Sequence, residues 1–462
     1  MSNECAQGWL ARAASKRTQC EKLVPPGWKL PSAIITCLTY PLEASKNNLI
    51  ELDIPRRSGI LTEKELRITE AYDVRRLLKA LASGELSSLE TSCLTEALFE
   101  QAQERARVID ALRERGQLAG PLHGLPVSLK DSFQVRGTDA TLGLIAYLDN
   151  GPSQENSCLV EVLLSLGAVP FCKTNVPQTL MTADSHNNIF GRTLNPWNTS
   201  LTAGGSTGGE GALIAFRGSP LGIGTDVGED PLFPWHPPIK GAVADVANLL
   251  RAQGHDIVYL TSQQCLIGQG YDVASQIFGL DKTAAQLVKK SGEPLVPSML
   301  YIREAVRGVK FDRSFLPDTR TIKDGLDRLS VLNVKRSEIQ EAWRKVWEKY
   351  RLDAVIGPGA QNTAVEHDMY ALAPYTCLFN LLDYPACVIP VGRVKIADSG
   401  GSFTKSPGQF APPYNPDNLN GAPTAIQVIT TRMRDEECLA VARLIDEYVR
   451  SKIGDMSTAA RL

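Results

Sequence analysis

The glycine-rich stretch Gly204-Gly-Ser-Thr-Gly-Gly-Glu-Gly-Ala-Leu-Ile-Ala215 is the most informative part of this sequence. Residues 204–228 contain nine glycines, whereas the whole chain of 462 residues has 37. Because glycine has no Cβ, such a cluster indicates that the backbone approaches another group closely. The apolar residues around it predict a short helix over 206–216 that leads into an apolar run over 221–223.

The glycines alone leave two interpretations open. A phosphate-binding loop would need the spacing G-x-x-x-x-G-K-[ST], or G-x-G-x-x-G with an acidic residue on the next strand. Neither pattern is present, and no lysine follows the glycines. The other interpretation is a helix that packs tightly on a strand, which uses glycine without any chemistry.

A lysine stands at the end of a predicted strand upstream. The segment His123-Gly-Leu-Pro-Val-Ser-Leu-Lys130-Asp131 contains a buried apolar strand over 125–129, and Lys130 follows it directly. A lysine taken alone is most often a solvated surface residue. In open α/β sheets, however, ligands bind beyond the carboxyl ends of the strands. Its position therefore makes Lys130 a candidate functional residue.

The rest of the chain alternates helical and strand patterns from about residue 62 onward. This alternation predicts an α/β fold with a mostly parallel sheet covered by helices on both faces. A capping box is expected at Thr62-Glu-Lys-Glu65. A helical arm is expected over 1–57, one domain over 58–462, and a long surface loop over 395–419. The expected strands are 125–129, 168–172, 221–223, 257–260, 353–356, 386–390 and 424–429, and the expected helices are 88–117, 153–166, 206–216, 236–253, 337–350 and 436–449.

Several blocks together resemble one known family. Thr174-Asn-Val-Pro-Gln178 follows the second strand, and Gly191-Arg-Thr-Leu-Asn-Pro-Trp197 leads into the glycine run. With the Lys130 and Gly204 blocks, these resemble the amidase signature family, most closely its fungal acetamidase-like branch. Further matching blocks are Ser58-Gly-Ile-Leu-Thr-Glu, Gly292-Glu-Pro-Leu-Val-Pro297, Asn380-Leu-Leu-Asp-Tyr-Pro385 and Gly421-Ala-Pro-Thr-Ala-Ile-Gln-Val428. The resemblance implies an α/β/α sandwich around a mixed central sheet.

The resemblance also implies a chemistry. The family hydrolyses amides through a Ser-Ser-Lys arrangement, in which a neutral lysine takes a proton through a bridging serine from a nucleophilic serine. Lys130 matches the lysine, and Ser206 matches the bridging serine, which family members hold after a non-proline cis peptide bond. A free lysine has a pKa of about 10.4, so a base near neutrality needs a pKa about 3 pH units lower.

The nucleophile of this arrangement is missing. The resemblance expects it 24 residues after Ser206, in the motif G-T-D-V-G-G-S, but the chain reads Gly224-Thr-Asp-Val-Gly-Glu-Asp230. Asp230 occupies the serine position, and no Ser or Thr follows until Thr261. If the Asp230 carboxylate reached Lys130, it would raise the pKa of the lysine and oppose its use as a base.

The resemblance assigns a substrate-binding role to four further residues. It places oxyanion donors at Val227, Gly228 and Glu229, and puts Leu180 in the acyl pocket. A glutamate where the family has glycine puts the oxyanion hole in doubt.

A larger segment is absent as well. In the family, the His-Pro-Pro-Ile block and the helix after it occur well downstream of the nucleophile. Here the segment 229–255 joins directly to Gly228. The block between them normally carries the nucleophile, an arginine in the motif S-I-R-x-P and several elements of the central sheet. The sequence therefore predicts an internal deletion at about 228/229 and an incomplete fold.

Composition excludes several other classes of protein. Lys plus Arg total 49 against 51 Asp plus Glu, which gives a net charge of −2 and no basic excess for nucleic acid. No run approaches the roughly 20 apolar residues of a membrane span, so no membrane partner is expected. Ten cysteines without metal-ligand spacing indicate reduced thiols in a cytoplasmic protein. Ala460-Arg461-Leu462 leaves peroxisomal import open as an alternative.

The remaining expectations concern partners and function. No cofactor or metal is expected, and a homodimer is expected by family analogy. None of the five histidines accompanies a G-x-S-x-G turn, which leaves a histidine-based serine hydrolase poorly supported. We predict a protein of the amidase family whose intact relatives hydrolyse a small carboxylic amide to an acid and ammonia or an amine, and which is itself catalytically impaired. The alternatives are a pseudoenzyme that binds a small molecule or a partner, and the product of a misassigned or truncated gene.

Overall fold

The chain divides into two compact units. The computed structural model describes residues 3–24, 26–83, 85–86, 98–219, 230–370, 372–395 and 403–454. The first unit comprises Met1–Ile223, Thr283–Tyr301 and Glu366–Tyr370, and the second comprises Gly224–Lys282, Ile302–Val365 and Ala371–Leu462. Residues 1–57 belong to the first unit. This geometric division does not test the predicted arm and single domain.

Both units contain more helix than strand. Those of the first unit are α1 (Asn3–Leu23), α2 (Ser32–Ile35), α3 (Ile54–Arg57), α4 (Glu63–Ala71), α5 (Val74–Ser83), α6 (Phe99–Glu114), α7 (Cys158–Ser165), α8 (Gly208–Ala215) and α12 (Thr283–Ser291). Those of the second unit are α9 (Pro237–Ala252), α10 (Ser262–Cys265), α11 (Ile267–Phe278), α14 (Gly325–Tyr350), α15 (Pro374–Leu382), α16 (Pro416–Leu419) and α17 (Asp435–Gly454), and α13 (Pro297–Gly308) contains a boundary between the units. Short 3-10 turns occur at η1 (Pro26–Trp28), η2 (Leu42–Ala44), η4 (Ile145–Asn150), η5 (Gln178–Leu180) and η6 (Thr319–Thr321). Within the described part of the chain, none of the helices is both long and apolar enough to span a bilayer.

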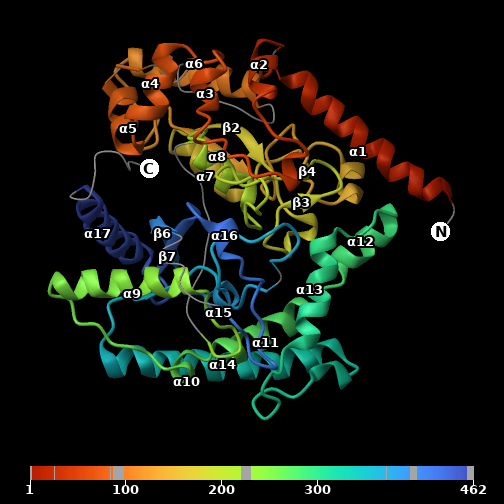
Figure 1. The fold of residues 1–462 in the computed structure, drawn as a ribbon. Coiled ribbons are helices and arrows are strands. Elements are labelled where there is room, and N and C mark those ends of the chain that lie inside the picture. Colours follow the sequence, from red (N-terminus) through yellow and green to blue (C-terminus); the bar gives the residue numbers. More distant parts are fainter. Residues whose placement is uncertain are drawn as a thin grey trace. The chain divides into compact units, whose positions relative to one another are not determined.

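A short parallel sheet lies at the centre of the first unit (Figure 1). Strand β1 (Pro126–Lys130) pairs in parallel with β2 (Val169–Thr174), and Lys130 lies opposite Thr174 at the carboxyl end of both strands. Helices α6 and α7 pack against β2, and α8 contacts both strands. A small antiparallel pair, β3 (His186–Asn187) and β4 (Gly191–Arg192), follows in the chain. Strand β1 thus places Lys130 at the carboxyl end of the parallel strands, where ligands bind in α/β folds.

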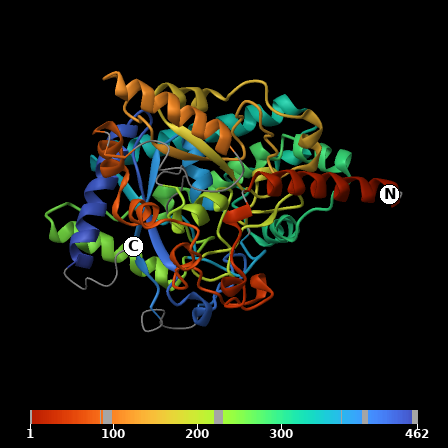
Figure 2. The same ribbon diagram turned by 90° about the horizontal axis from the view of Figure 1, so that it is seen from above.

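The second unit contains an antiparallel sheet. Strand β7 (Pro423–Ile429) lies between β5 (Val355–Gly357) and β6 (Ala386–Arg393). Helices α9 and α17 pack on this sheet and on each other, and their apolar residues form one core with those of the strands. Both ribbon views show α17, in dark blue, alongside these strands (Figures 1 and 2).

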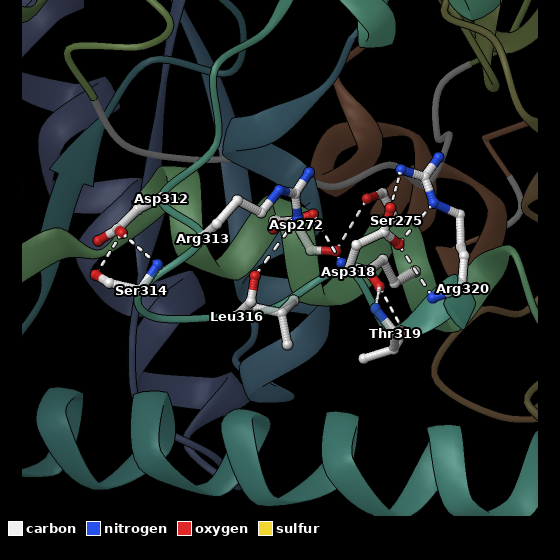
Figure 3. A network of polar contacts seen from close by, with 10 residues as sticks. Asp272, Ser275, Asp312, Arg313, Ser314, Leu316, Asp318, Thr319 and Arg320 are labelled. Atoms are coloured by element: carbon white, nitrogen blue, oxygen red, sulfur yellow. Dashed lines mark hydrogen bonds and ion pairs between the residues drawn. The ribbon is translucent and has the colours of Figure 1, made fainter. Parts of the chain in front are cut away.

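Polar contacts hold the segment 312–320 on helix α11 in the second unit (Figure 3). Asp272 of α11 is 4% exposed, and its carboxylate accepts a hydrogen bond of 2.9 Å from Arg313. Gln276, one turn further along α11, accepts one of 2.5 Å from the hydroxyl of Thr319. These contacts satisfy the buried carboxylate of Asp272 and the side-chain amide oxygen of Gln276.

Most of the predicted elements are present. The Thr62–Glu65 capping box and the strands β1, β2, β5, β6 and β7 are confirmed, as is the mixed α/β class. Helix α14 begins about three turns before its predicted start. Residues 221–223 and part of the predicted helix 88–117 lie outside the described residues.

Two expectations about strands are wrong. Among the described strands only β1 and β2 pair in parallel, so the sheets are not mostly parallel. Residues 257–260 form no strand. No described strand pairs with this apolar run, and Val258 and Tyr259 are 41% and 68% exposed.

Candidate functional site

The structure brings Lys130 and Ser206 together. Lys130 is the last residue of β1 and is half-buried. Its Nζ donates a hydrogen bond of 2.6 Å to Oγ of Ser206 and one of 3.2 Å to Oγ1 of Thr207. The peptide bond between Gly205 and Ser206 is cis, as the family resemblance implies.

Close backbone packing explains the glycines that flank this pair. A Cβ added at Gly209, in the first turn of α8, would lie 2.4 Å from the backbone nitrogen of Asn175. One added at Gly205 would lie 2.6 Å from the carbonyl oxygen of Thr182. Neither position tolerates a side chain without movement of the backbone. The same run of glycines therefore lets the backbone pack closely against Asn175 and Thr182 and places Ser206 beside Lys130.

A buried carboxylate lies in the same cluster of polar residues. Glu210 of α8 is 4% exposed, and its two carboxylate oxygens accept hydrogen bonds of 2.5 Å from the hydroxyl of Ser128 and 2.9 Å from that of Thr174. Ser128 Oγ also lies 2.9 Å from Oγ of Ser219. Sequence analysis missed these residues. The available signal was the position of Ser128, two residues before Lys130 on the same face of a strand.

The surroundings shift the protonation of both ionisable groups toward the neutral form. Burial lowers the pKa of Lys130, and the negative charge of Glu210 partly opposes this effect. Burial raises the pKa of Glu210, and its hydrogen bonds from Ser128 and Thr174 partly oppose that rise. The direction of the Lys130 shift is the one that a general base requires.

A buried ion-pair network supports the segment next to Ser206. The guanidinium of Arg192 bonds the carboxylate of Asp184 and lies 2.8 Å from that of Asp368. The neighbouring Ser185 donates a hydrogen bond of 3.0 Å to the carbonyl of Gly204 and accepts one of 3.0 Å from the backbone nitrogen of Gly208. Ser185 thus holds both sides of the turn that carries Ser206, and the Arg192 ion pairs anchor its neighbour Asp184.

Leu180 lies on a strained turn. Leu180 and the preceding Thr179 have φ angles of 62° and 69°, in the left-handed region that residues with a side chain rarely adopt. Both are half-buried in the turn η5. Such strain is concentrated at ligand-binding and catalytic sites, so the turn is a candidate part of the site. The role of Leu180 in an acyl pocket stays a prediction.

Asp230 has hydrogen-bond partners in the second unit. It is 5% exposed, and its carboxylate accepts hydrogen bonds of 2.9 Å from the backbone nitrogen of Leu232 and 3.0 Å from that of Gly268. Its own backbone nitrogen donates to the hydroxyl of Tyr375 at 2.9 Å. Gly268 is in the first turn of α11, so the carboxylate caps this helix.

The other predicted site residues, Val227, Gly228 and Glu229, lie outside the described residues. Among the residues that are described, no group of three or more His, Cys, Asp or Glu side chains is placed to hold a metal ion.

Comparison with known sequences identifies similar proteins along the whole chain. The sequence model of the family described as Amidase matches residues 77–230 and 229–439. An acetamidase of Emericella nidulans is 30% identical over 577 residues, which cover 98% of this chain and 100% of that protein. An amidase of Gibberella moniliformis is 28% identical, with 96% of this chain and 99% of that protein covered.

Solved structures show a similar fold. Fatty acid amide hydrolase superposes with a TM-score of 0.81 at 22% identity, over 96% of each chain. A bacterial aryl acylamidase of the amidase signature enzymes superposes with a TM-score of 0.56 at 15% identity, over 85% of this chain and 99% of that one. At such identities the likeness concerns the fold.

The match to the family model is interrupted within the chain. The family model matches in two pieces that meet at residues 229–230. The alignment with the Emericella acetamidase runs over 577 positions, although this chain has 462 residues. The relative therefore contains residues that have no counterpart in this chain.

Proposed function

The chain belongs to the amidase family, and on that premise we propose that it retains the lysine and bridging serine of a Ser-Ser-Lys relay but lacks the nucleophile. The hydrogen bond of 2.6 Å between Lys130 and Ser206 supports the retained half of this relay. Asp230, in place of the nucleophilic serine, supports the loss of the other half. The chain is thus catalytically impaired toward the small carboxylic amides that such a site would accept.

The chemistry of Asp230 is the observation that carries this proposal. In the complete relay, the nucleophile loses a proton to the bridging serine as it attacks the carbonyl carbon. An ionised carboxylate has no proton to give. Both oxygens of Asp230 also accept backbone hydrogen bonds, from Leu232 and Gly268. Lys130 and Ser206 can therefore receive a proton, but the residue that should supply it cannot.

The substrate class is supported by a relative. A curated relative at 30% identity is named an acetamidase. We therefore assign to the complete form of this site the hydrolysis of a small carboxylic amide to an acid and ammonia or an amine.

Hydrolysis of acetamide and benzamide by the purified 462-residue chain tests the proposal. We expect ammonia release to equal that of the Lys130→Ala variant, because losing a covalent nucleophile removes nearly all catalysis. Release by the wild-type chain that is abolished in Lys130→Ala would overturn the proposal.

The break in the family match at residues 229–230 favours a second candidate, an ordinary amidase whose transcript encodes an internal block that this sequence lacks. Sequencing of the source transcript across the codons for Val227 to Pro231 distinguishes the two. A longer product that restores Gly-Gly-Ser-Ile-Arg would support the ordinary amidase, with Lys130 and Ser206 in its relay. A short product alone would support a true deletion.

A further inference from the structure

Two neighbouring pairs of contacts join β1 to α8. The side chains of Ser128 and Lys130 leave the same face of β1, because alternate residues of a strand do so. Lys130 contacts Ser206 and Thr207, just before α8 begins. Ser128 contacts Glu210, in the first turn of α8. The ammonium group and the carboxylate therefore occupy one polar cluster between the same two elements.

We propose that Glu210 is a positioning residue that sets the protonation state of Lys130. Two hydroxyl groups, of Ser128 and Thr174, donate to its carboxylate and so favour its ionised form. The negative charge in turn favours the ammonium form of Lys130. Glu210 is 4% exposed, and water screens charges little at such depth.

Other charged groups near β1 are already paired. Asp131, the next residue in the chain, forms an ion pair of 3.1 Å with Lys173 of β2, and both side chains are 3% exposed. The carboxylate of Asp131 also accepts a hydrogen bond of 2.6 Å from the hydroxyl of Thr141. Glu210 is the one ionisable residue in the described helix α8. Of the carboxylates on α8 and on the residue after β1, that of Glu210 is therefore the one expected to influence the protonation of Lys130.

The opposing influences on the two groups agree with this inference. Burial lowers the pKa of Lys130 and raises that of Glu210, whereas their mutual attraction works against both changes. Removing the carboxylate leaves burial unopposed, so the neutral amine becomes more abundant at a given pH.

Competitive acetylation with acetic anhydride tests this inference on the full chain. The neutral amine is the reactive form, and a peptide map gives the rate at Lys130 as a function of pH. In Glu210→Gln, the midpoint of this profile should move to lower pH, with a rate at pH 7 about threefold or more above wild type. Accessibility changes the plateau of the profile and not its midpoint, so a structural role alone would not move the midpoint.

Glu293→Gln is the matched control. Glu293 is also 4% exposed in the first unit, but it accepts hydrogen bonds from Gln178 and Asn188. Its loss should leave the Lys130 midpoint unchanged. If Glu210→Gln does not fold, Thr174→Val removes one donor to the carboxylate, and the midpoint should move in the same direction. An unchanged or raised midpoint in the folded variant would overturn the inference.

The result does not depend on amide hydrolysis. Acetylation reports the protonation of Lys130 directly. A catalytically impaired chain and an active one would give the same dependence of the acetylation rate on pH. Failure of this inference and failure of the proposed function are therefore distinguishable.

Discussion

The carboxylate of Asp230 accepts hydrogen bonds from two backbone N–H groups, one of them in the first turn of α11. Burial raises the pKa of Asp230, and the hydrogen bonds from Gly268 and Leu232 lower it. These contacts are structural ones, made within the second unit. A residue that stands where a nucleophile is expected can thus be retained because it stabilises the fold.

Replacing this carboxylate should reduce stability without creating an enzyme. We expect Asp230→Ser to lower the free energy of unfolding by about 1–3 kcal/mol, because buried backbone donors lose their acceptor. Urea denaturation measures the change, and Asp256→Ser, at an exposed position, is the control. A variant as stable as wild type, or one that gains amidase activity, would contradict this account.

His236 gives a second prediction at the level of one residue. Burial lowers the pKa of His236 to about 4, although its Nε2 lies 3.0 Å from the carbonyl oxygen of Pro412. Between pH 6.5 and about 4, the unfolded chain binds a proton that the folded chain does not. This histidine therefore destabilises the fold progressively as the pH falls through that window.

His236→Gln should remove this contribution. Stability should fall by about 3 kcal/mol less than in wild type as the pH is lowered from 6.5 to 4. Urea denaturation at several pH values measures the difference between the two chains. Equal pH dependence of both would contradict this account, because it would mean that the imidazole binds its proton equally in the folded and unfolded chains.

At the level of elements, the junction of β1, β2 and α8 positions the candidate site. The glycines of α8 allow its first turn to contact the segment after β2, and this contact places Ser206 beside Lys130. Ser185, next to the Arg192–Asp184 ion pair, bonds the backbone on both sides of the same turn. The site therefore depends on backbone packing as much as on its side chains.

A pair of glycine substitutions tests this dependence. Gly209→Ala should cost about 1–3 kcal/mol, because its Cβ would lie 2.4 Å from the backbone of Asn175. Gly211→Ala, in the same helix, meets no atom closer than 3.7 Å and should be neutral or stabilising. Thermal unfolding compares the two variants. Equal melting temperatures would show that α8 does not pack as described.

For the molecule as a whole, local patterns predicted the elements better than their pairing. The capping box at Thr62 and the strand that ends at Lys130 depend on residues close in sequence, and both were predicted. Residues 257–260 were predicted as a strand because the run is apolar. A strand also needs a neighbour, and a short run of sequence does not reveal whether one exists.

The candidate site was predictable where a strand end or a family motif marks it. Lys130 was found from its place at a strand end and Ser206 from the family motif, and they lie together. Glu210 was missed because an acid in the first turn of a helix usually serves the helix dipole. The contact of Arg192 with Asp368 joins residues 176 positions apart, and no local pattern encodes such a distance. Long-range polar contacts were therefore the part that sequence could not give.

The central claim is that the Lys130–Ser206 pair is assembled without a nucleophile, and covalent labelling tests it most directly. A fluorophosphonate reacts with an activated serine to leave a stable adduct, which intact mass and a peptide map detect. We predict no adduct in the wild-type chain above the level in Lys130→Ala. An adduct on Ser206 or another hydroxyl that disappears in Lys130→Ala would contradict the account, because it would reveal a working nucleophile.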